Sequence, residues 1–108
     1  MTIFAQTQSE MNIEAAKDYK KADTELNKVY QLVLKKYADN TLFIKEMKAA
    51  QMLWVQFRDA EFKRAYPRYN EGNTYYGTMF SLEKSTFMET LTIERTKTLK
   101  GILKTGLR

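Results

Sequence analysis

The sequence predicts an all-α protein, an elongated antiparallel three-helix bundle with a tyrosine-rich loop between the second and third helices. Apolar residues recur at spacings of three and four along most of the chain, which is typical of helices with one buried face. The 108 residues include only 4 Gly and 1 Pro, so few positions interrupt a helix. A chain of this length forms one domain around one core.

The first helix is predicted over residues 8–38. Thr7 and Glu10 fit a capping box, in which the threonine hydroxyl accepts a hydrogen bond from the backbone N–H of Glu10. The apolar stripe of this helix consists of Met11, Ala15, Tyr19, Ala22, Leu26, Val29, Val33 and Tyr37. Polar residues at 39–41 interrupt the stripe and end the helix.

The second helix is predicted over residues 41–65. Its apolar stripe consists of Phe43, Met47, Ala50, Trp54, Phe57 and Ala60. The helix should end near Ala65, because Pro67 disfavours helical backbone at Tyr66. The short connection from the first helix predicts that the two form an antiparallel hairpin.

The loop is predicted over residues 66–77, a polar stretch that contains Gly72 and Gly77. The third helix follows over residues 78–105, with Gly106 as its C-cap. Its apolar positions are Phe80, Phe87, Leu91, Leu99 and Ile102. A helix of about 30 residues is roughly 45 Å long, so the bundle should be elongated.

Composition limits the chemistry available to this chain. It has no cysteine and no histidine, which excludes disulfides, removes thiolate and imidazole metal ligands, and removes the usual general base. No two acidic residues lie at a clean spacing on an apolar face, so no acid–base pair is indicated. No stretch approaches the roughly 18 apolar residues of a membrane span. We therefore predict no catalytic residues, no metal and no cofactor.

The net charge of +5 is concentrated at the C-terminal end. The cations there are Arg95, Lys97, Lys100, Lys104 and Arg108, with no acid among them. One interpretation is an anionic-surface or nucleic-acid site on the last four, although no aromatic residues for base stacking are interleaved with them. The other is a solvated helix end, which the helix dipole favours. The sequence favours the second interpretation.

Several polar residues lie beside the apolar stripes, where they are candidates either for a charged pocket or for a structural hydrogen-bonding network. They are Asp23, Asn27, Tyr30, Gln51, Trp54, Arg58, Asp59, Thr92 and Arg95. Buried polar groups usually bond to one another, so the network is the favoured interpretation. We expect Arg58 or Arg95 to pair with Asp23 or Asp59 between helices, since an unpaired buried charge is costly.

The tyrosine-rich loop has two interpretations that the sequence does not separate. Tyrosine and arginine are enriched at binding hot spots. The candidate partner-binding residues are Tyr66, Arg68, Tyr69, Tyr75 and Tyr76. Alternatively, one or two of these rings cap the open end of the bundle.

Four stretches of the chain carry a resemblance to a known family. They are Gln8-Ser9-Glu10-Met11-Asn12, Ala22-Asp23-x-x-Leu26-Asn27-x-x-Tyr30, Ala50-Gln51-x-x-Trp54-x-x-Phe57-Arg58-Asp59-Ala60-Glu61 and Leu91-Thr92-x-x-Arg95-Thr96-x-x-Leu99. In these residues and their order the chain resembles the lysozyme-inhibitor LprI-like N-terminal domain, a bacterial domain of secreted and lipid-anchored proteins.

The resemblance implies a non-catalytic exported binding domain over residues 7–108, periplasmic or secreted, whose partner is a protein or an envelope polymer. Residues 1–6 would be the end of a signal peptide or a disordered N-terminus. The family name implies lysozyme inhibition. Animal lysozymes are strongly basic, however, and this chain has a pI of about 9.4, so like charges disfavour that partner.

The chain departs from the family pattern at three positions. Family members commonly carry cysteine where this sequence has Glu14, Phe62 and Phe87. Helix packing alone must therefore hold this protein together. We expect Phe62 and Phe87 to lie in contact and to fill the space of the missing covalent link.

Overall fold

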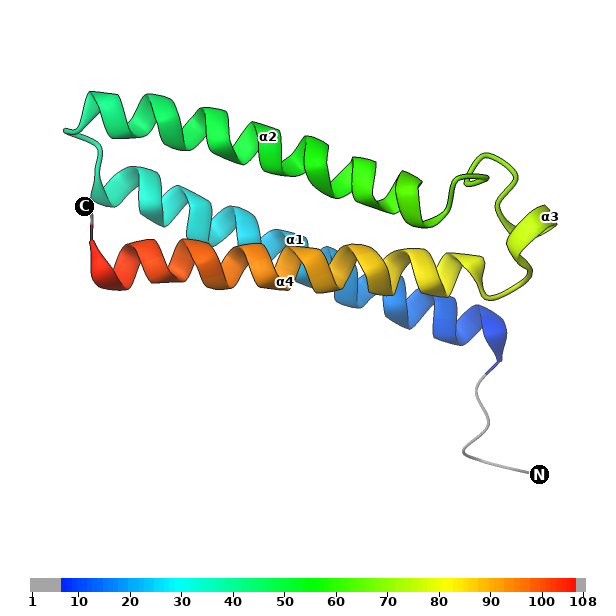
Figure 1. The fold of residues 1–108 in the computed structure, drawn as a ribbon. Coiled ribbons are helices and arrows are strands. Elements are labelled where there is room, and N and C mark those ends of the chain that lie inside the picture. Colours follow the sequence, from blue (N-terminus) through cyan, green and yellow to red (C-terminus); the bar gives the residue numbers. More distant parts are fainter. Residues whose placement is uncertain (1–6, 107–108) are drawn as a thin grey trace.

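The computed structural model describes residues 7–106, and these form three long helices and one short one. The helices are α1 (Gln8–Lys36), α2 (Thr41–Ala65), α3 (Asn73–Tyr76) and α4 (Phe80–Thr105) (Figure 1). The predicted all-α fold is confirmed. The alternatives for residues 1–6, and the cation at Arg108, lie outside the described residues.

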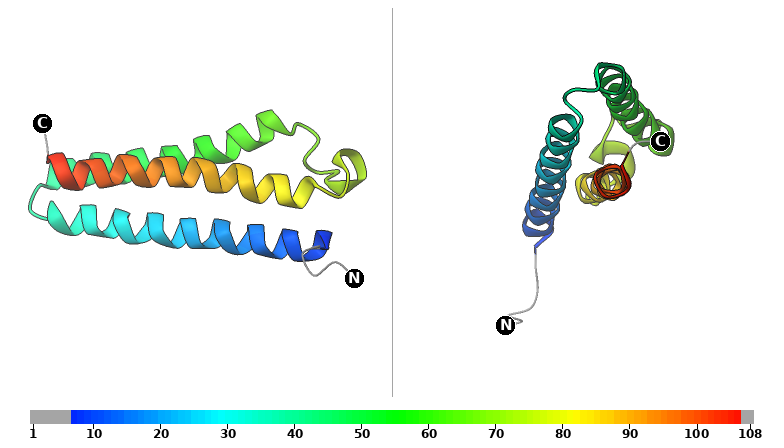
Figure 2. Two further views of the ribbon diagram at one scale, coloured as in Figure 1. Left: turned by 90° about the horizontal axis from the view of Figure 1, so that it is seen from below. Right: turned by 90° about the vertical axis from the view of Figure 1, so that its left-hand side faces the viewer.

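The closest helix pair is α1 with α4, which run side by side in the same direction (Figures 1 and 2). Helix α2 runs back in the opposite direction and stands farther from both. The short connection after α1 therefore reverses the chain without making α1 and α2 the tightest pair. The molecule is elongated, with principal extents of 58 × 33 × 15 Å.

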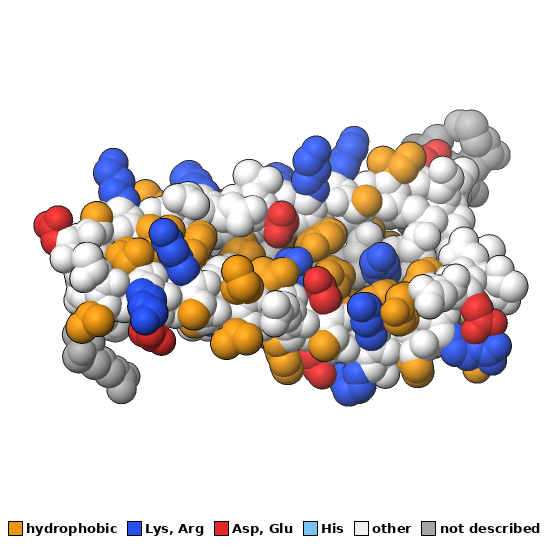
Figure 3. Space-filling view, turned by 90° about the horizontal axis from the view of Figure 1, so that it is seen from above, with side chains coloured by type: hydrophobic (Ala, Val, Ile, Leu, Met, Phe, Trp, Pro, Cys, Tyr) orange, Lys and Arg blue, Asp and Glu red, His pale blue; other side chains and the backbone are white. Residues whose placement is uncertain are grey.

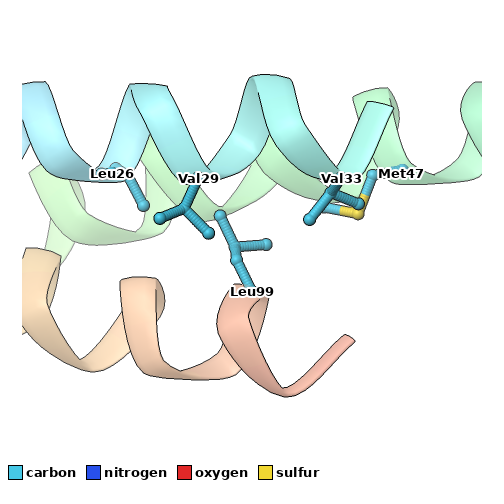
Figure 4. Close-up of a cluster of buried hydrophobic side chains, with 5 residues drawn as sticks. All are labelled: Leu26, Val29, Val33, Met47 and Leu99. Carbon is cyan, nitrogen blue, oxygen red and sulfur yellow. The ribbon is translucent and has the colours of Figure 1, made fainter. Parts of the chain in front are cut away.

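The hydrophobic core is divided into two clusters along the bundle axis. The cluster at the α1–α2 connection consists of Leu26, Val29, Val33, Met47 and Leu99. In Figure 4 the Leu99 side chain of α4 points toward α1, where Val29 and Val33 meet it. The cluster at the loop end contains Phe62, Phe80 and Met88. The buried polar residues Gln51, Arg58, Thr92 and Thr96 lie on the stretches of α2 and α4 between the two clusters.

The predicted stripe of α1 is confirmed, but the predicted stripe of α2 is half wrong. Ala50, Phe57 and Ala60 are exposed. The buried face of α2 instead contains Met47, Gln51, Arg58 and Phe62. An apolar pattern cannot identify this face, because two of its four residues are polar and their burial depends on bonds to α1 and α4.

Local signals determine the helix ends. The Thr7 hydroxyl accepts a hydrogen bond from Glu10 N at 3.0 Å, as the capping box predicts. Asn40 Oδ1 accepts from Phe43 N at 3.0 Å and caps α2 in the same way. Gly106, with φ of 80°, ends α4 as predicted. At the same end, the Tyr37 hydroxyl donates to the Ile102 carbonyl at 3.0 Å and ties α1 to α4.

The loop differs from the prediction in one respect, because it contains the short helix α3. Gly72 and Gly77 precede and follow α3 with positive φ values of 50° and 89°. These backbone angles are readily available only to glycine. They turn the chain sharply at both ends of α3, which brings the Tyr76 ring against the ring of Phe80. Among the residues described, no helix is long and apolar enough to cross a bilayer.

Candidate functional site

The Arg58 guanidinium lies where the three long helices meet. Its Nη1 donates a hydrogen bond to Thr92 Oγ1 of α4 at 3.3 Å. The same nitrogen lies 3.6 Å from Asp23 Oδ1 of α1, and Nε lies 3.5 Å from Asp59 Oδ1 of α2 itself. The side chain of Arg58 is 10% exposed, so this charge is held largely away from water. One side chain therefore connects all three helices.

Two guanidinium groups lie close to the indole ring of Trp54. The ring centroid is 5.1 Å from Arg58 Cζ and 5.9 Å from Arg95 Cζ, within the range of cation–π attraction. Arg95 also donates from Nε to Gln51 Oε1 at 3.0 Å and so joins α4 to α2. Burial lowers the pKa of Arg95 below its ordinary value.

Most of the predicted polar residues belong to this one cluster. The residues brought together are Asp23, Gln51, Trp54, Arg58, Asp59, Thr92 and Arg95. The other two lie apart, because Asn27 is exposed and Tyr30 packs against the Leu26 core cluster. The expected ion pair between helices is present, between Arg58 and Asp23. These contacts link α1, α2 and α4 to one another.

One member of the cluster was missed in the sequence. The ring of Tyr19 lies 5.9 Å from Arg58 Cζ, on the α1 side. The sequence pattern placed Tyr19 in the apolar stripe of α1, so it indicated an ordinary core residue and gave no sign of the contact with Arg58. Within residues 7–106, no group of three or more acidic side chains is placed to hold a metal ion.

A second cluster, of aromatic rings, closes the loop end of the bundle. Phe62 lies at its centre, with ring centroids 5.1 Å from Tyr66, 6.0 Å from Phe80 and 6.0 Å from Phe87. The contact of Phe62 with Phe87 confirms the expected contact between these two rings. The Phe87 ring is only half-buried, however.

Three of the four loop tyrosines belong to this aromatic cap. Tyr66 contacts Phe62, Tyr69 lies 6.4 Å from the same ring, and Tyr76 stacks on Phe80 at 5.4 Å. The Tyr76 hydroxyl also accepts a hydrogen bond from Arg68 N at 3.0 Å. These three rings therefore contribute to the packing of the cap.

Tyr75 is the loop tyrosine that faces solvent, with 53% of its surface exposed. The Arg68 Cζ atom lies 4.0 Å from the centroid of the Tyr75 ring. Arg68 Nε and Nη2 also donate hydrogen bonds to the two carboxylate oxygens of Glu71. A neighbouring pair joins Arg64 to Glu61 at 3.0 Å. The loop thus presents an aromatic and arginine surface on which the cations are balanced by carboxylates.

Two tyrosine hydroxyls have raised pKa values in this fold. The pKa of Tyr19 is raised above 10.0, mainly by burial. The pKa of Tyr66 is raised by burial and next by the nearby Glu83 carboxylate. A raised pKa means that the folded state holds the phenolic proton more tightly than the unfolded chain does. The contribution of each tyrosine to the stability of the fold is therefore complete below pH 10.0, and it is lost as pH rises through the pKa of that tyrosine in the folded protein.

We therefore expect the free energy of unfolding to fall as pH rises above about 10, and Tyr66→Phe to reduce that fall. Urea denaturation followed by circular dichroism at increasing pH measures both. A free energy that is constant above pH 10 in the unmodified protein would contradict the assignment.

The basic end of α4 is less available than the sequence indicated. Arg95 turns inward to Gln51, and Lys100 Nζ lies 3.4 Å from Glu25 Oε1 of α1. Lys97 and Lys104 remain exposed. Of the four cations proposed to bind an anionic surface or nucleic acid, Lys97 and Lys104 are thus exposed and make no described ion pair. Arg108 lies outside the described residues.

These features define a small all-α bundle whose polar interior is used to join helices and whose loop end presents an aromatic surface. The chain matches the family model described as Lysozyme inhibitor LprI over residues 3–99, and it belongs to this family. The expected resemblance is thereby confirmed. Comparisons with curated proteins and with solved structures gave no match.

Proposed function

We propose that this protein is a non-catalytic, exported binding domain of the bacterial envelope that inhibits a lysozyme through its tyrosine-rich loop. Family membership over residues 3–99 is the observation that carries this proposal. The polar cluster around Arg58 supports it indirectly, because its members contact one another across the three long helices.

The exposed edge of the loop is the proposed contact surface. Tyr75 supplies a large ring at low entropic cost, and Arg68 supplies hydrogen-bond donors beside it. The cap beneath fixes both residues, since Tyr76 packs against Tyr75 at 4.8 Å and accepts a hydrogen bond from the Arg68 backbone. A rigid support of this kind reduces the ordering cost of binding.

Charge selects among lysozymes. The protein carries a net charge of +5, so a strongly basic lysozyme is repelled at long range. The pairing of Arg68 with Glu71 reduces this repulsion at the loop itself. We therefore propose that the preferred partner is a lysozyme of low isoelectric point.

The test measures binding by calorimetry and inhibition of cell-wall hydrolysis, with one acidic and one strongly basic lysozyme. We expect tighter binding to the acidic enzyme, and we expect Tyr75→Ser to weaken it by more than about tenfold without lowering the melting temperature. Leu42→Ser is the matched control, because Leu42 is 78% exposed and lies at the other end of α2.

Absence of binding to either lysozyme would refute the lysozyme assignment. Equal weakening by Tyr75→Ser and Leu42→Ser would refute the loop as the contact surface. Binding that is tight, specific for the basic enzyme and unaffected by salt would refute the charge argument.

A further inference from the structure

Helix α2 has a second stripe, on the side that does not face the core. This outer stripe consists of Glu46, Ala50, Leu53, Phe57, Ala60 and Arg64. All six residues are exposed, and Leu53 and Phe57 remain 64% and 56% accessible. Figure 3 looks down on the α2 side of the molecule and shows hydrophobic side chains gathered along it. The outer stripe includes the three residues that the sequence pattern had placed in the core.

The spacing of the outer stripe is that of a coiled-coil seam. Its members follow one another by steps of four, three, four, three and four residues, which is the alternation of a and d positions. From Glu46 to Arg64 the seam is about 27 Å long. Between these two charges every member of the seam is apolar.

The seam is complementary to itself when a second copy is turned around. In an antiparallel pair centred at the level of Val55, Leu53 meets the partner's Phe57 and Ala50 meets the partner's Ala60. Glu46 then meets the partner's Arg64. A two-fold axis repeats each of these contacts, as a self-complementary dimer interface requires. Each of these contacts places a residue at an a position opposite a residue at a d position. An antiparallel pair of helices produces this arrangement at the heptad spacing.

The chemistry of each layer supports this pairing. Leucine and phenylalanine bury apolar surface at the centre, and the alanines allow the two helices to approach closely. Arg64 already pairs with Glu61, but its side chain is 66% exposed and retains donors for a second carboxylate. Glu46 gains an opposite charge at each end of the interface.

We infer that the outer stripe of α2 binds a second copy of this chain in an antiparallel, two-fold dimer. Glu46 favours this occupant over a lipid surface, because it lies in line with the apolar residues. Insertion of the seam into a bilayer would drive its carboxylate toward hydrocarbon, whereas the partner's Arg64 neutralises it. This inference is independent of the proposed lysozyme contact, which uses the loop.

Sedimentation equilibrium of the full chain tests the dimer, with two neighbouring exposed residues as a matched pair. Leu53→Glu should abolish the dimer or raise its dissociation constant by more than about tenfold. Met52→Glu should change it little, because Met52 is equally accessible at 65% but lies about 100° around the helix, outside the seam. Both variants should keep the helical circular dichroism spectrum.

A charge reversal tests the ends of the seam. Glu46→Arg alone places like charges together at both ends and should weaken the dimer, as should Arg64→Glu. The variant with both changes restores opposite charges and should recover the dimer. Recovery in the double variant would be unexpected for a dimer formed through another surface.

The absence of cysteine allows a direct test of register. Mixing Ala50→Cys with Ala60→Cys under mild oxidation should give a disulfide-linked dimer. Each variant alone should not, since its two identical positions would lie about 15 Å apart along the seam. A protein that remains monomeric at all concentrations would overturn the inference, as would a dimer insensitive to Leu53→Glu. So would a monomer that binds anionic vesicles through Leu53.

Discussion

Truncation of Phe62 to alanine is expected to lower the free energy of unfolding by about 3–5 kcal/mol. Phe62 is only 5% exposed, and its ring contacts those of Tyr66, Phe80 and Phe87. The variant removes the centre of the aromatic cap and leaves a cavity that these rings cannot all fill. Urea denaturation followed by circular dichroism and by the fluorescence of Trp54 measures the change.

Phe87→Ala is the matched comparison, because Phe87 belongs to the same cluster but is half-buried. Phe87→Ala should lower the free energy of unfolding clearly less than Phe62→Ala does, since less apolar surface returns to water. Equal losses at the two positions would contradict the central place of Phe62. A loss below about 1 kcal/mol for Phe62→Ala would show that the cap contributes little to stability.

Replacement of Arg58 by alanine is expected to lower the free energy of unfolding by about 2–3 kcal/mol. The change removes the hydrogen bond to Thr92, the ion pair with Asp23 and the contact with the Trp54 ring. Arg58→Met should cost less, because its unbranched side chain retains packing and introduces no buried charge. The same denaturation experiment applies to both variants.

The ion pair itself is tested by a double-mutant cycle between Arg58 and Asp23. Asp23→Asn alone should cost less than about 1 kcal/mol, because the Asp23 side chain is 44% exposed and water replaces part of the interaction. In an Arg58→Met background the same change should cost still less. Additive losses without coupling would mean that the 3.6 Å approach contributes nothing to stability.

The three long helices, their ends and the family could be predicted from the amino-acid sequence without a structure. The stripe of α1, the caps at Thr7 and Gly106, and the end of α2 before Pro67 depend on spacing and on the backbone preferences of single residues. Both kinds of information are local, so they can be derived without knowledge of the other helices. The contact of Phe62 with Phe87 was also predicted, from the covalent link that the family resemblance implies near these two positions.

Which face of α2 is buried, and which polar groups meet, depends on how the helices pack against one another. Sequence spacing favoured Ala50 and Phe57 for the core, yet the fold buries Gln51 and Arg58. A polar side chain is buried only where partners satisfy it, and those partners, Asp23, Thr92 and Arg95, come from the other two long helices. Their positions depend on how the helices rotate against one another, and that rotation leaves the apolar side of α2 in solvent.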